Sequence, residues 1–110
     1  MDGVKRGDVV LIVAQGDFGK PRPAVVVQSD LFNDTHATVS VCPLTSTVVD
    51  APMFRVSIEP AAENGLKKRS QAMVDKVQPL RRERIKERIG MLTNAEMQAI
   101  GAALKLWFSL

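Results

Sequence analysis

The sequence predicts a mainly β (α+β) domain, built as a small, curled antiparallel barrel that ends in one amphipathic α-helix. Three observations predict this class. About five short segments have the apolar or alternating pattern of strands, turn-forming residues separate them, and one capped helical pattern ends the chain. A length of 110 residues is close to the commonest domain size, so residues 1–110 are expected to form one domain.

Two apolar runs in the first third of the chain form a predicted hairpin. Asp8–Val13 and Ala24–Gln28 are rich in β-branched side chains, and the segment between them contains glycine and proline. Arg22 lies between Pro21 and Pro23. Proline fixes its own φ and moves the preceding residue into an extended conformation. The sequence therefore predicts that Arg22 is held in a defined orientation at the rim of the sheet.

The next segment contains one helical turn and a third strand. Ser29 can cap a turn that continues through Phe32. Ala37–Leu44 then alternates apolar and hydroxyl side chains, as a strand with one buried face does. Pro43 has no amide hydrogen and is expected to end the pairing of this strand, which leaves Thr45 beyond its carboxyl end.

Two further strands are predicted in the second half of the chain. Met53–Ile58 and Ser70–Val77 both alternate, and Asn64-Gly65 marks a turn between them. Leu80–Ile89 is either a short strand or a helical turn, because its many charged side chains hide the period.

The clearest helix lies at the end of the chain. Thr93 and Glu96 have the spacing of a capping box, and Gly90 precedes them as a breaker. Apolar residues then recur on one face at helical spacing: Met97, Ile100, Leu104 and Trp107 or Phe108. On this pattern Trp107 is expected to belong to the core. About five short strands closed by a single helix indicate an SH3-like barrel.

Basic side chains gather in the second half of the sequence. Residues 1–60 hold five Lys and Arg against seven Asp and Glu, whereas residues 61–110 hold ten against five. They form clusters at 67–69 and 81–88. A basic half indicates a polyanion or an acidic protein as partner. For the second cluster, a solvated face with Glu83 and Glu87 as local partners is the alternative.

Several kinds of site are excluded by residue counts. A single cysteine, Cys42, allows no internal disulfide, and a single histidine, His36, allows no ordinary zinc site. The sequence has no phosphate-binding glycine loop, no paired metal carboxylates and no Ser/His/Asp set, so no metal and no cofactor are expected. Cys42 is expected in the core and His36 in solvent. The chain has no apolar run that could cross a membrane and no signal peptide, which predicts a cytoplasmic protein without a membrane partner.

Arg22 and Thr45 are the side chains with the clearest chemical potential. If the second and third strands are neighbours, both residues lie at strand ends beside loops, where functional groups are often found. A guanidinium offers a bidentate fork to phosphate, and a hydroxyl donates a further hydrogen bond. Together they would form an anion site.

Five short motifs carry a resemblance to a known family. They follow one another in the order RGDV (6–9), GKPRPAVVV (19–27), PLTS (43–46), NGL (64–66) and SQAMVDKV (70–77). In these motifs the chain resembles the MazF/PemK family of toxin endoribonucleases from bacterial type II toxin–antitoxin modules. The resemblance extends from about Val4 to the C-terminal helix.

The resemblance implies an activity and a set of partners. It implies a homodimer that cleaves single-stranded RNA, messenger RNA foremost, at short sequence motifs without a metal ion. The 2′-OH of the RNA would attack the phosphate, giving 2′,3′-cyclic phosphate and 5′-OH ends, and DNA would be inert because it lacks this hydroxyl. An acidic antitoxin would cover the RNA groove, and operator DNA would be contacted only through the toxin–antitoxin complex.

The resemblance also assigns roles to residues. Arg22 and Thr45 match the catalytic pair of the family, and Ser70 and Asp75 match its serine and its acidic residue. Met73 occupies the position where some PemK-type relatives have a second catalytic arginine, so a mechanism with two arginines is not supported. Arginine is a poor base because its pKa lies above ~12. Asp75, Ser70, water or the substrate itself could transfer the protons.

Base selection is expected from the loops around the site, Ala14–Pro21, Thr47–Pro52 and Lys67–Arg69. Phe18 is the one obvious loop side chain for stacking on a base. The residues expected to bind substrate are Phe18, Lys20, Ser46, Lys68, Arg69, Ser70 and Asp75.

Two alternatives belong to other functional classes. A DNA gyrase poison of the CcdB type shares the barrel and acts through C-terminal helix residues that include a tryptophan, and this chain ends Trp107-Phe108-Ser109-Leu110. That alternative leaves Arg22 and Thr45 without a role, and Trp107 is expected in the core. A non-catalytic SH3-like module for RNA or peptides would need an aromatic groove, whereas the chain has four Phe, one Trp and no Tyr.

Overall fold

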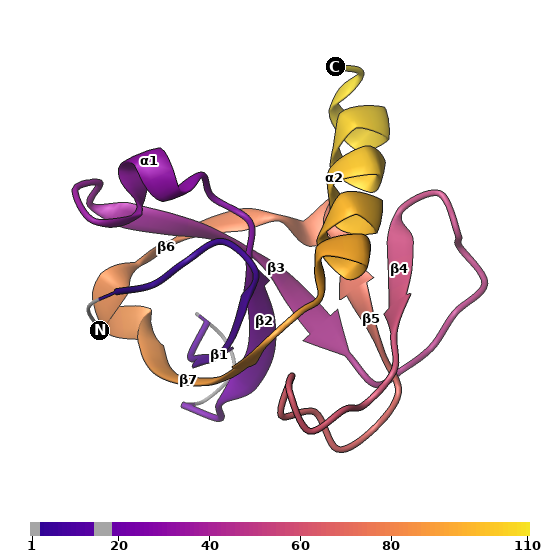
Figure 1. Cartoon of the computed structure of the whole chain (residues 1–110), viewed down its shortest axis with the longest axis horizontal. Helices are drawn as coiled ribbons and strands as arrows, with labels where there is room; N and C mark the ends of the chain where they lie inside the picture. The colour runs from indigo at the N-terminus through magenta and orange to yellow at the C-terminus, as the bar shows by residue number, and fades with distance from the viewer. Residues whose placement is uncertain (1–2, 15–18) are drawn as a thin grey trace.

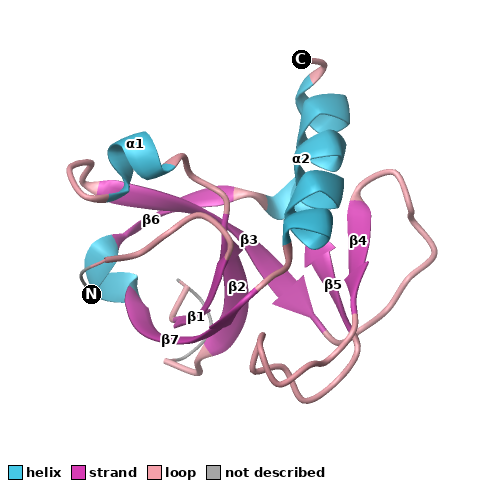
Figure 2. Cartoon of the chain, viewed as in Figure 1, coloured by secondary structure: helices cyan, strands magenta, loops and turns pink. Residues whose placement is uncertain are grey.

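Seven strands, two α-helices and two 3₁₀ turns make up the part of the chain that the structure describes, residues 3–14 and 19–110 (Figures 1 and 2). The structure is a computed structural model. In chain order the elements are β1 Asp8–Ile12, β2 Arg22–Val26, α1 Asp30–Asn33, β3 Thr38–Thr45, β4 Arg55–Ile58, β5 Ser70–Met73, η1 Val74–Lys76, β6 Gln78–Arg81, η2 Arg82–Arg84, β7 Ile85–Met91 and α2 Asn94–Phe108.

The strands form one antiparallel sheet in the order β4-β5-β3-β2-β1-β7, and β6 also pairs with β3. β5 and β6 use the same edge of β3: β5 pairs with Leu44 and Thr45, and β6 with residues 38–41. The chain then passes from β6 through η2 into β7, which pairs with β1. Within the described residues no ladder joins β6 to β7, so the chain itself closes the curl (Figure 1).

The sheet has an apolar core on each side. One cluster is enclosed by the curl and contains Val10, Val26 and Val41. The other contains Val9 and Cys42 and lies between the sheet and α2. Neighbouring residues of one strand therefore belong to different cores, because successive side chains point to opposite faces. Strands buried on both faces read as continuous apolar runs, as β1 and β2 do. The predicted class, mainly β with a C-terminal helix, is confirmed.

The C-terminal helix begins as predicted and ends outside the core. The Glu96 amide donates to Thr93 Oγ1 (3.1 Å), and the Thr93 amide donates to Glu96 Oε1 (2.9 Å), which completes the capping box. Ile100 is fully buried in the core beside the sheet. Trp107 is 48% exposed and contacts Phe54, with 5.8 Å between ring centroids. The prediction that Trp107 belongs to the core is wrong, because the end of α2 extends beyond the sheet (Figure 1).

The strand boundaries differ from the predictions. β1 ends at Ile12, one residue early, and β2 spans Arg22–Val26, two residues before the predicted range. Three further differences have a physical reason. β3 continues past Pro43 to Thr45, because β5 pairs with its other edge there. β4 begins at Arg55, because the Ala51 carbonyl accepts the amides of Phe54 and Arg55 in a turn. The expected strand 70–77 ends at Met73, where η1 begins. The unassigned segment 80–89 contains the end of β6, the turn η2 and most of β7.

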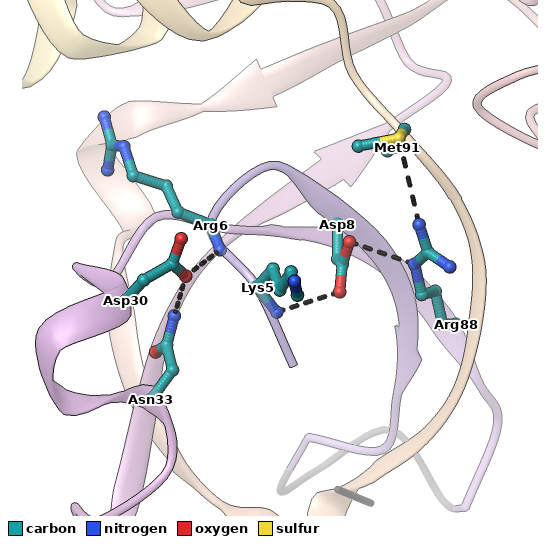
Figure 3. Close-up of polar contacts among 7 residues, drawn as sticks. All are labelled: Lys5, Arg6, Asp8, Asp30, Asn33, Arg88 and Met91. Atoms are coloured by element: carbon teal, nitrogen blue, oxygen red, sulfur yellow. Dashed lines mark hydrogen bonds and ion pairs between the residues drawn. The ribbon is translucent and has the colours of Figure 1, made fainter. Parts of the chain in front are cut away.

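The RGDV segment is part of the framework of the fold, as Figure 3 shows. Asp8 is 1% exposed and accepts hydrogen bonds from the Lys5 amide (2.9 Å) and from Arg88 Nε (2.9 Å). Asp30 accepts from the Arg6 amide (2.8 Å) and from Asn33 Nδ2 (2.8 Å), and these bonds lower the pKa of Asp30. The motif therefore joins β1 to β7 and to α1.

The second basic cluster also has partners inside the chain. Arg82 Nε donates to the His36 carbonyl (2.9 Å), and Arg84 Nη1 donates to the Val13 carbonyl (3.3 Å). Together with the Arg88–Asp8 pair, these contacts tie η2 and β7 to the first half of the chain. Among the described helices, none is long and apolar enough to cross a membrane.

Candidate active site

A groove of about 790 Å³ opens where β2 begins and β3 ends, and where the segment 66–78 passes beside them. Its described lining residues are Ile12, Ala14, Arg22, Pro23, Pro43, Leu44, Thr45, Ser46, Thr47, Leu66, Lys67, Lys68, Ser70, Met73, Lys76 and Gln78. Apolar side chains from several strands contribute, and the polar side chains come mainly from the strand ends and the adjoining loops. Such a mixed surface can contact both the bases and the phosphates of a nucleic acid.

The sheet register places Arg22 across from Thr45. β2 and β3 pair as Ala24↔Pro43, Val25↔Cys42 and Val26↔Val41. Continuing this register by two residues sets Arg22 opposite Thr45. Directly opposed residues of antiparallel strands project on the same face, with Cβ atoms roughly 4.5–5.5 Å apart when they are paired. Both residues line the groove, and Arg22 is exposed at its rim.

A local turn fixes the Thr45 hydroxyl. The Thr47 amide donates to Thr45 Oγ1 (3.1 Å), a hydroxyl turn that uses one lone pair of the oxygen. A hydroxyl has one proton to donate and two lone pairs. Thr45 can therefore still donate its proton to an oxygen of a bound phosphate, from a position that the backbone of its own loop determines.

Lysines and a buried serine form the opposite side of the groove. Ser70 is 4% exposed and donates its hydroxyl proton to the Lys68 carbonyl (3.0 Å), which holds the segment 68–70 in place. Lys67, Lys68 and Lys76 are exposed and line the groove with Arg22. The described lining thus has four cationic side chains and no carboxylate. Its charge favours a polyanion.

The groove brings together five of the nine predicted site residues. Those five are Arg22, Thr45, Ser46, Lys68 and Ser70. Lys20 is exposed and is not among the residues that line the groove. Arg69 pairs instead with Glu59 (3.1 Å), and Phe18 lies outside the described residues.

Asp75 lies away from the groove, beside Arg55, with 3.9 Å between Arg55 Nε and Asp75 Oδ1. The turn η1 explains this placement. A strand through 77 would project Met73 and Asp75 on one face. Because β5 ends at Met73, Met73 lines the groove while Asp75 does not, and the adjacent Lys76 does.

Lys76 and Gln78 are groove residues that the sequence did not indicate as site residues. Both follow η1, and nothing in the alternation of Ser70–Val77 reveals that turn. Lys67 belongs to a basic segment that was expected near the site, although the residue itself was not singled out. The basic triplet 67–69 thus indicates the location of the site from the sequence alone. The position of Lys76 in the groove follows only once the end of β5 at Met73 is known.

Cys42 lies next to Pro43 and is fully buried in the core beside α2. Burial raises the pKa of its thiol to about 12. Since the thiolate is the nucleophilic form, Cys42 is an inert core residue at neutral pH. This agrees with its predicted place in the core.

Comparison with solved structures identifies the class of this fold. An endoribonuclease in complex with its cognate antitoxin, from a mycobacterial species, superposes with a TM-score of 0.82 and 24% identity, covering 98% of this chain and 97% of that chain. The chain therefore has the same fold as that endoribonuclease, with the same arrangement of sheet and C-terminal helix.

Comparison of sequences gives the family. The family model of PemK-like, MazF-like toxins of type II toxin–antitoxin systems matches residues 5–108. A probable endoribonuclease MazF from Mycolicibacterium smegmatis is 37% identical over 108 residues, 97% of this chain and 98% of that protein. Endoribonuclease MazF9 from Mycobacterium tuberculosis is 32% identical over 116 residues, 97% and 98% of the two chains. The chain belongs to the PemK-like, MazF-like toxin family, as its motifs predicted.

Proposed function

We propose that this chain is the toxin of a type II toxin–antitoxin module and acts as a sequence-specific endoribonuclease on single-stranded RNA. Membership of the family and the names of the two relatives described above support the endoribonuclease activity. The observation that supports the proposal for this chain is that Arg22 and Thr45 line one groove, whose described lining has four cationic side chains and no carboxylate.

The groove suits strand cleavage by transesterification. The 2′-oxygen of the RNA attacks the adjacent phosphorus, the bond from phosphorus to the 5′-oxygen breaks, and a 2′,3′-cyclic phosphate and a 5′-OH result. Arg22 holds the non-bridging oxygens through its fork and stabilises the charge of the phosphorane, and Thr45 donates a hydrogen bond to one of these oxygens. Because RNA supplies the nucleophile, this reaction needs no metal ion.

Proton transfer is assigned to groups at the groove. The 2′-OH must lose a proton, and the 5′-oxygen must gain one. Ser70 donates its proton to the Lys68 carbonyl, and Asp75 is not among the groove residues. Water is therefore our candidate for accepting the 2′-OH proton, and an ammonium group of Lys67, Lys68 or Lys76 is our candidate for donating a proton to the 5′-oxygen.

The proposed partners follow from the same site. A relative of this fold was solved with its cognate antitoxin, and an acidic antitoxin segment would complement the cationic groove. We place the reaction in the cytoplasm, with residues 1–110 acting as one domain in a homodimer, and messenger RNA as the main substrate. Operator DNA would be contacted through the antitoxin complex.

The deciding experiment uses a long, unstructured RNA incubated in EDTA with the wild-type protein, Arg22→Ala or Arg81→Ala, followed by mapping of the new ends. We expect discrete cuts with 5′-OH ends from the wild type and from Arg81→Ala, because Arg81 is exposed outside the groove. Arg22→Ala should lower the cleavage rate by roughly 10²–10³-fold, the usual cost of removing one donor to a developing oxyanion.

An intact RNA after incubation with folded wild-type protein would contradict the proposal. The exposure of Trp107 removes one argument against a gyrase poison, so supercoiled DNA with gyrase is the second substrate to test. The family match and the Arg22–Thr45 site still favour the ribonuclease.

A further inference from the structure

We infer that Gln71 is a positioning residue for RNA recognition, because it holds the loop 46–52 that forms one rim of the groove. This inference rests on the proposed ribonuclease function and adds to it a residue that does not line the groove. Ser46 and Thr47, at the start of the loop, line the groove, while residues 48–52 line a second hollow on its other side. The position of this loop therefore sets the width and shape of the rim.

The carboxamide of Gln71 binds the middle of the loop through two hydrogen bonds. Gln71 Nε2 donates to the Val49 carbonyl (2.8 Å), and the Val49 amide donates to Gln71 Oε1 (3.1 Å). The side chain thus pairs with both polar groups of one residue, as a neighbouring strand would. Gln71 is 5% exposed, so water competes little for these bonds.

The position of Gln71 in the sheet links the loop directly to Thr45. Gln71 pairs with Thr45 on β3 and with Ser57 on β4. Side chains on one rung of a sheet project from the same face. Thr45, Gln71 and Ser57 therefore form a polar row that begins in the groove and runs beneath the loop. Because Gln71 pairs with Thr45, a displacement of Gln71 would also displace Thr45.

A second contact fixes the orientation of the Gln71 carboxamide. Arg55 Nη1 donates to Gln71 Oε1 (3.4 Å), and Arg55 lies beside Asp75. A guanidinium can only donate, so the oxygen of Gln71 must face it and the amide nitrogen must face the Val49 carbonyl. Asp75 and Arg55 thereby act through Gln71 on the loop, which gives Asp75 a positioning role away from the groove.

Burial does little to hold this loop. Val48 and Val49 are 45% and 43% exposed, although both are apolar. Because these valines are only partly buried, the order of the loop depends strongly on its hydrogen bonds: the turn at Thr47, the two bonds to Gln71 and the turn at Ala51. Removing the middle contact would leave the segment between the two turns free to move.

The test compares Gln71→Ala with Gln28→Ala. Gln28 is a matched control, since its carboxamide also bonds to main-chain groups, with Nε2 donating to the Thr38 carbonyl (3.1 Å) and Oε1 accepting from the Ser40 amide (3.2 Å). It joins the chain after β2 to residues 38–40 of β3, which do not line the groove. A third variant, Gln71→Glu, keeps the acceptor for the Val49 amide and for Arg55 but loses the donor to the Val49 carbonyl.

Three readouts separate positioning from general stability: cut sites mapped on the long RNA, KM and kcat on a short RNA containing the strongest site, and amide hydrogen exchange of residues 46–51. We expect Gln71→Ala to raise KM about tenfold with a smaller change in kcat, to alter the order of preferred sites, and to speed exchange in the loop. Gln71→Glu should fall between it and the wild type, and Gln28→Ala should keep the wild-type site order.

Three results would overturn the inference in different ways. If the wild type cleaves RNA and Gln71→Ala shows the same sites and the same KM, the function stands and the role of Gln71 fails. If the wild type leaves RNA intact, the proposed function fails and the role in recognition fails with it, whatever the exchange data show. Equal losses in Gln71→Ala and Gln28→Ala would assign Gln71 to stability alone.

Discussion

Arg22 and Cys42 lie on neighbouring strands in opposite surroundings. Arg22 is at the exposed start of β2, whereas Cys42 pairs with Val25 inside the core. The strand geometry separates them, because successive side chains alternate between the two faces and burial increases away from the strand end. One ladder thus presents a permanent cation to the groove and keeps a thiol out of it.

Cys42 gives a prediction about pH. Burial raises its pKa from 9.0 to about 12 in the folded protein. Between these values the unfolded chain loses the thiol proton and the folded chain keeps it, so the free energy of unfolding falls as pH rises above 9.0. We expect urea titrations to show a steeper loss of stability above this pH for the wild type than for Cys42→Ala. Both proteins contain the same lysines, so the titration of lysine contributes equally to the two curves. Parallel curves for the two proteins would contradict this.

At the residue scale, the sequence predicted the side chains whose position is determined locally. The two prolines around Arg22 and the strand end at Thr45 were sufficient to place both residues at one rim. Asp75 and Gln71 were not predictable in the same way. Their partners, Arg55 and Val49, are 20 and 22 positions away and become neighbours only through the pairing of β4, β5 and the loop.

At the element scale, the turn 60–66 packs closely against the end of β7. Asn64 is 2% exposed, and its side chain accepts the amides of Ala61 (3.1 Å) and Leu66 (3.0 Å). The Met91 amide donates to the Glu63 carbonyl (2.9 Å). A Cβ added at Gly90 would lie 2.4 Å from the same carbonyl oxygen, so the backbones approach closely only because residue 90 is glycine.

Two glycine-to-alanine substitutions should therefore have opposite effects. Gly90→Ala forces a clash with backbone atoms and should lower the free energy of unfolding by about 1–3 kcal/mol. Gly101→Ala, inside α2, places its Cβ 3.6 Å from an atom of the flexible Arg6 side chain and should raise stability by roughly 0.5–1 kcal/mol through helix propensity. Chemical denaturation measures both, and a stabilised Gly90→Ala protein would refute the packing argument.

Elements with local signals were predicted well. Ser29 caps α1 through the Leu31 amide (3.2 Å), and Thr93 and Glu96 begin α2 as their spacing indicated. The segment 80–89 was not assigned, because its arginines have structural partners elsewhere in the chain. Arg82 bonds to the His36 carbonyl, 46 positions earlier, and no local period records such a contact.

At the scale of the whole molecule, the basic half of the sequence has two uses. Lys67, Lys68 and Lys76 line the groove, whereas Arg82, Arg84 and Arg88 bond to carbonyls or to Asp8. The predicted polyanion surface and the predicted face with local partners are therefore both present, in different segments. The composition indicates the positive charge of this half, and only the fold shows which cationic side chains remain available to bind a polyanion.

The salt dependence of RNA binding should distinguish these cations. Each phosphate contact on single-stranded nucleic acid contributes about −0.7 to the slope of log K against log salt concentration. Lys68→Ala should weaken binding and reduce the slope by about that amount. Lys105→Ala removes an exposed charge on α2, outside the groove, and should leave the slope unchanged. Arg22→Ala protein, used as the common background, prevents cleavage during the titration. Equal slopes for both lysine variants would show that Lys68 does not contact phosphate.

The closure of the curl by β7 has a consequence for the synthesis of this chain. Arg88 reaches Asp8 across 80 positions, and β7 pairs along β1, so the earliest strand has no complete partner until the last strand has left the ribosome. Contacts of such long range form late and slowly. Arg22 and Thr45 are made early, yet the lysines opposite them and the strand that closes the sheet come later. We therefore expect a chain whose synthesis stops before β7 to lack the closed sheet and to be inactive as a nuclease.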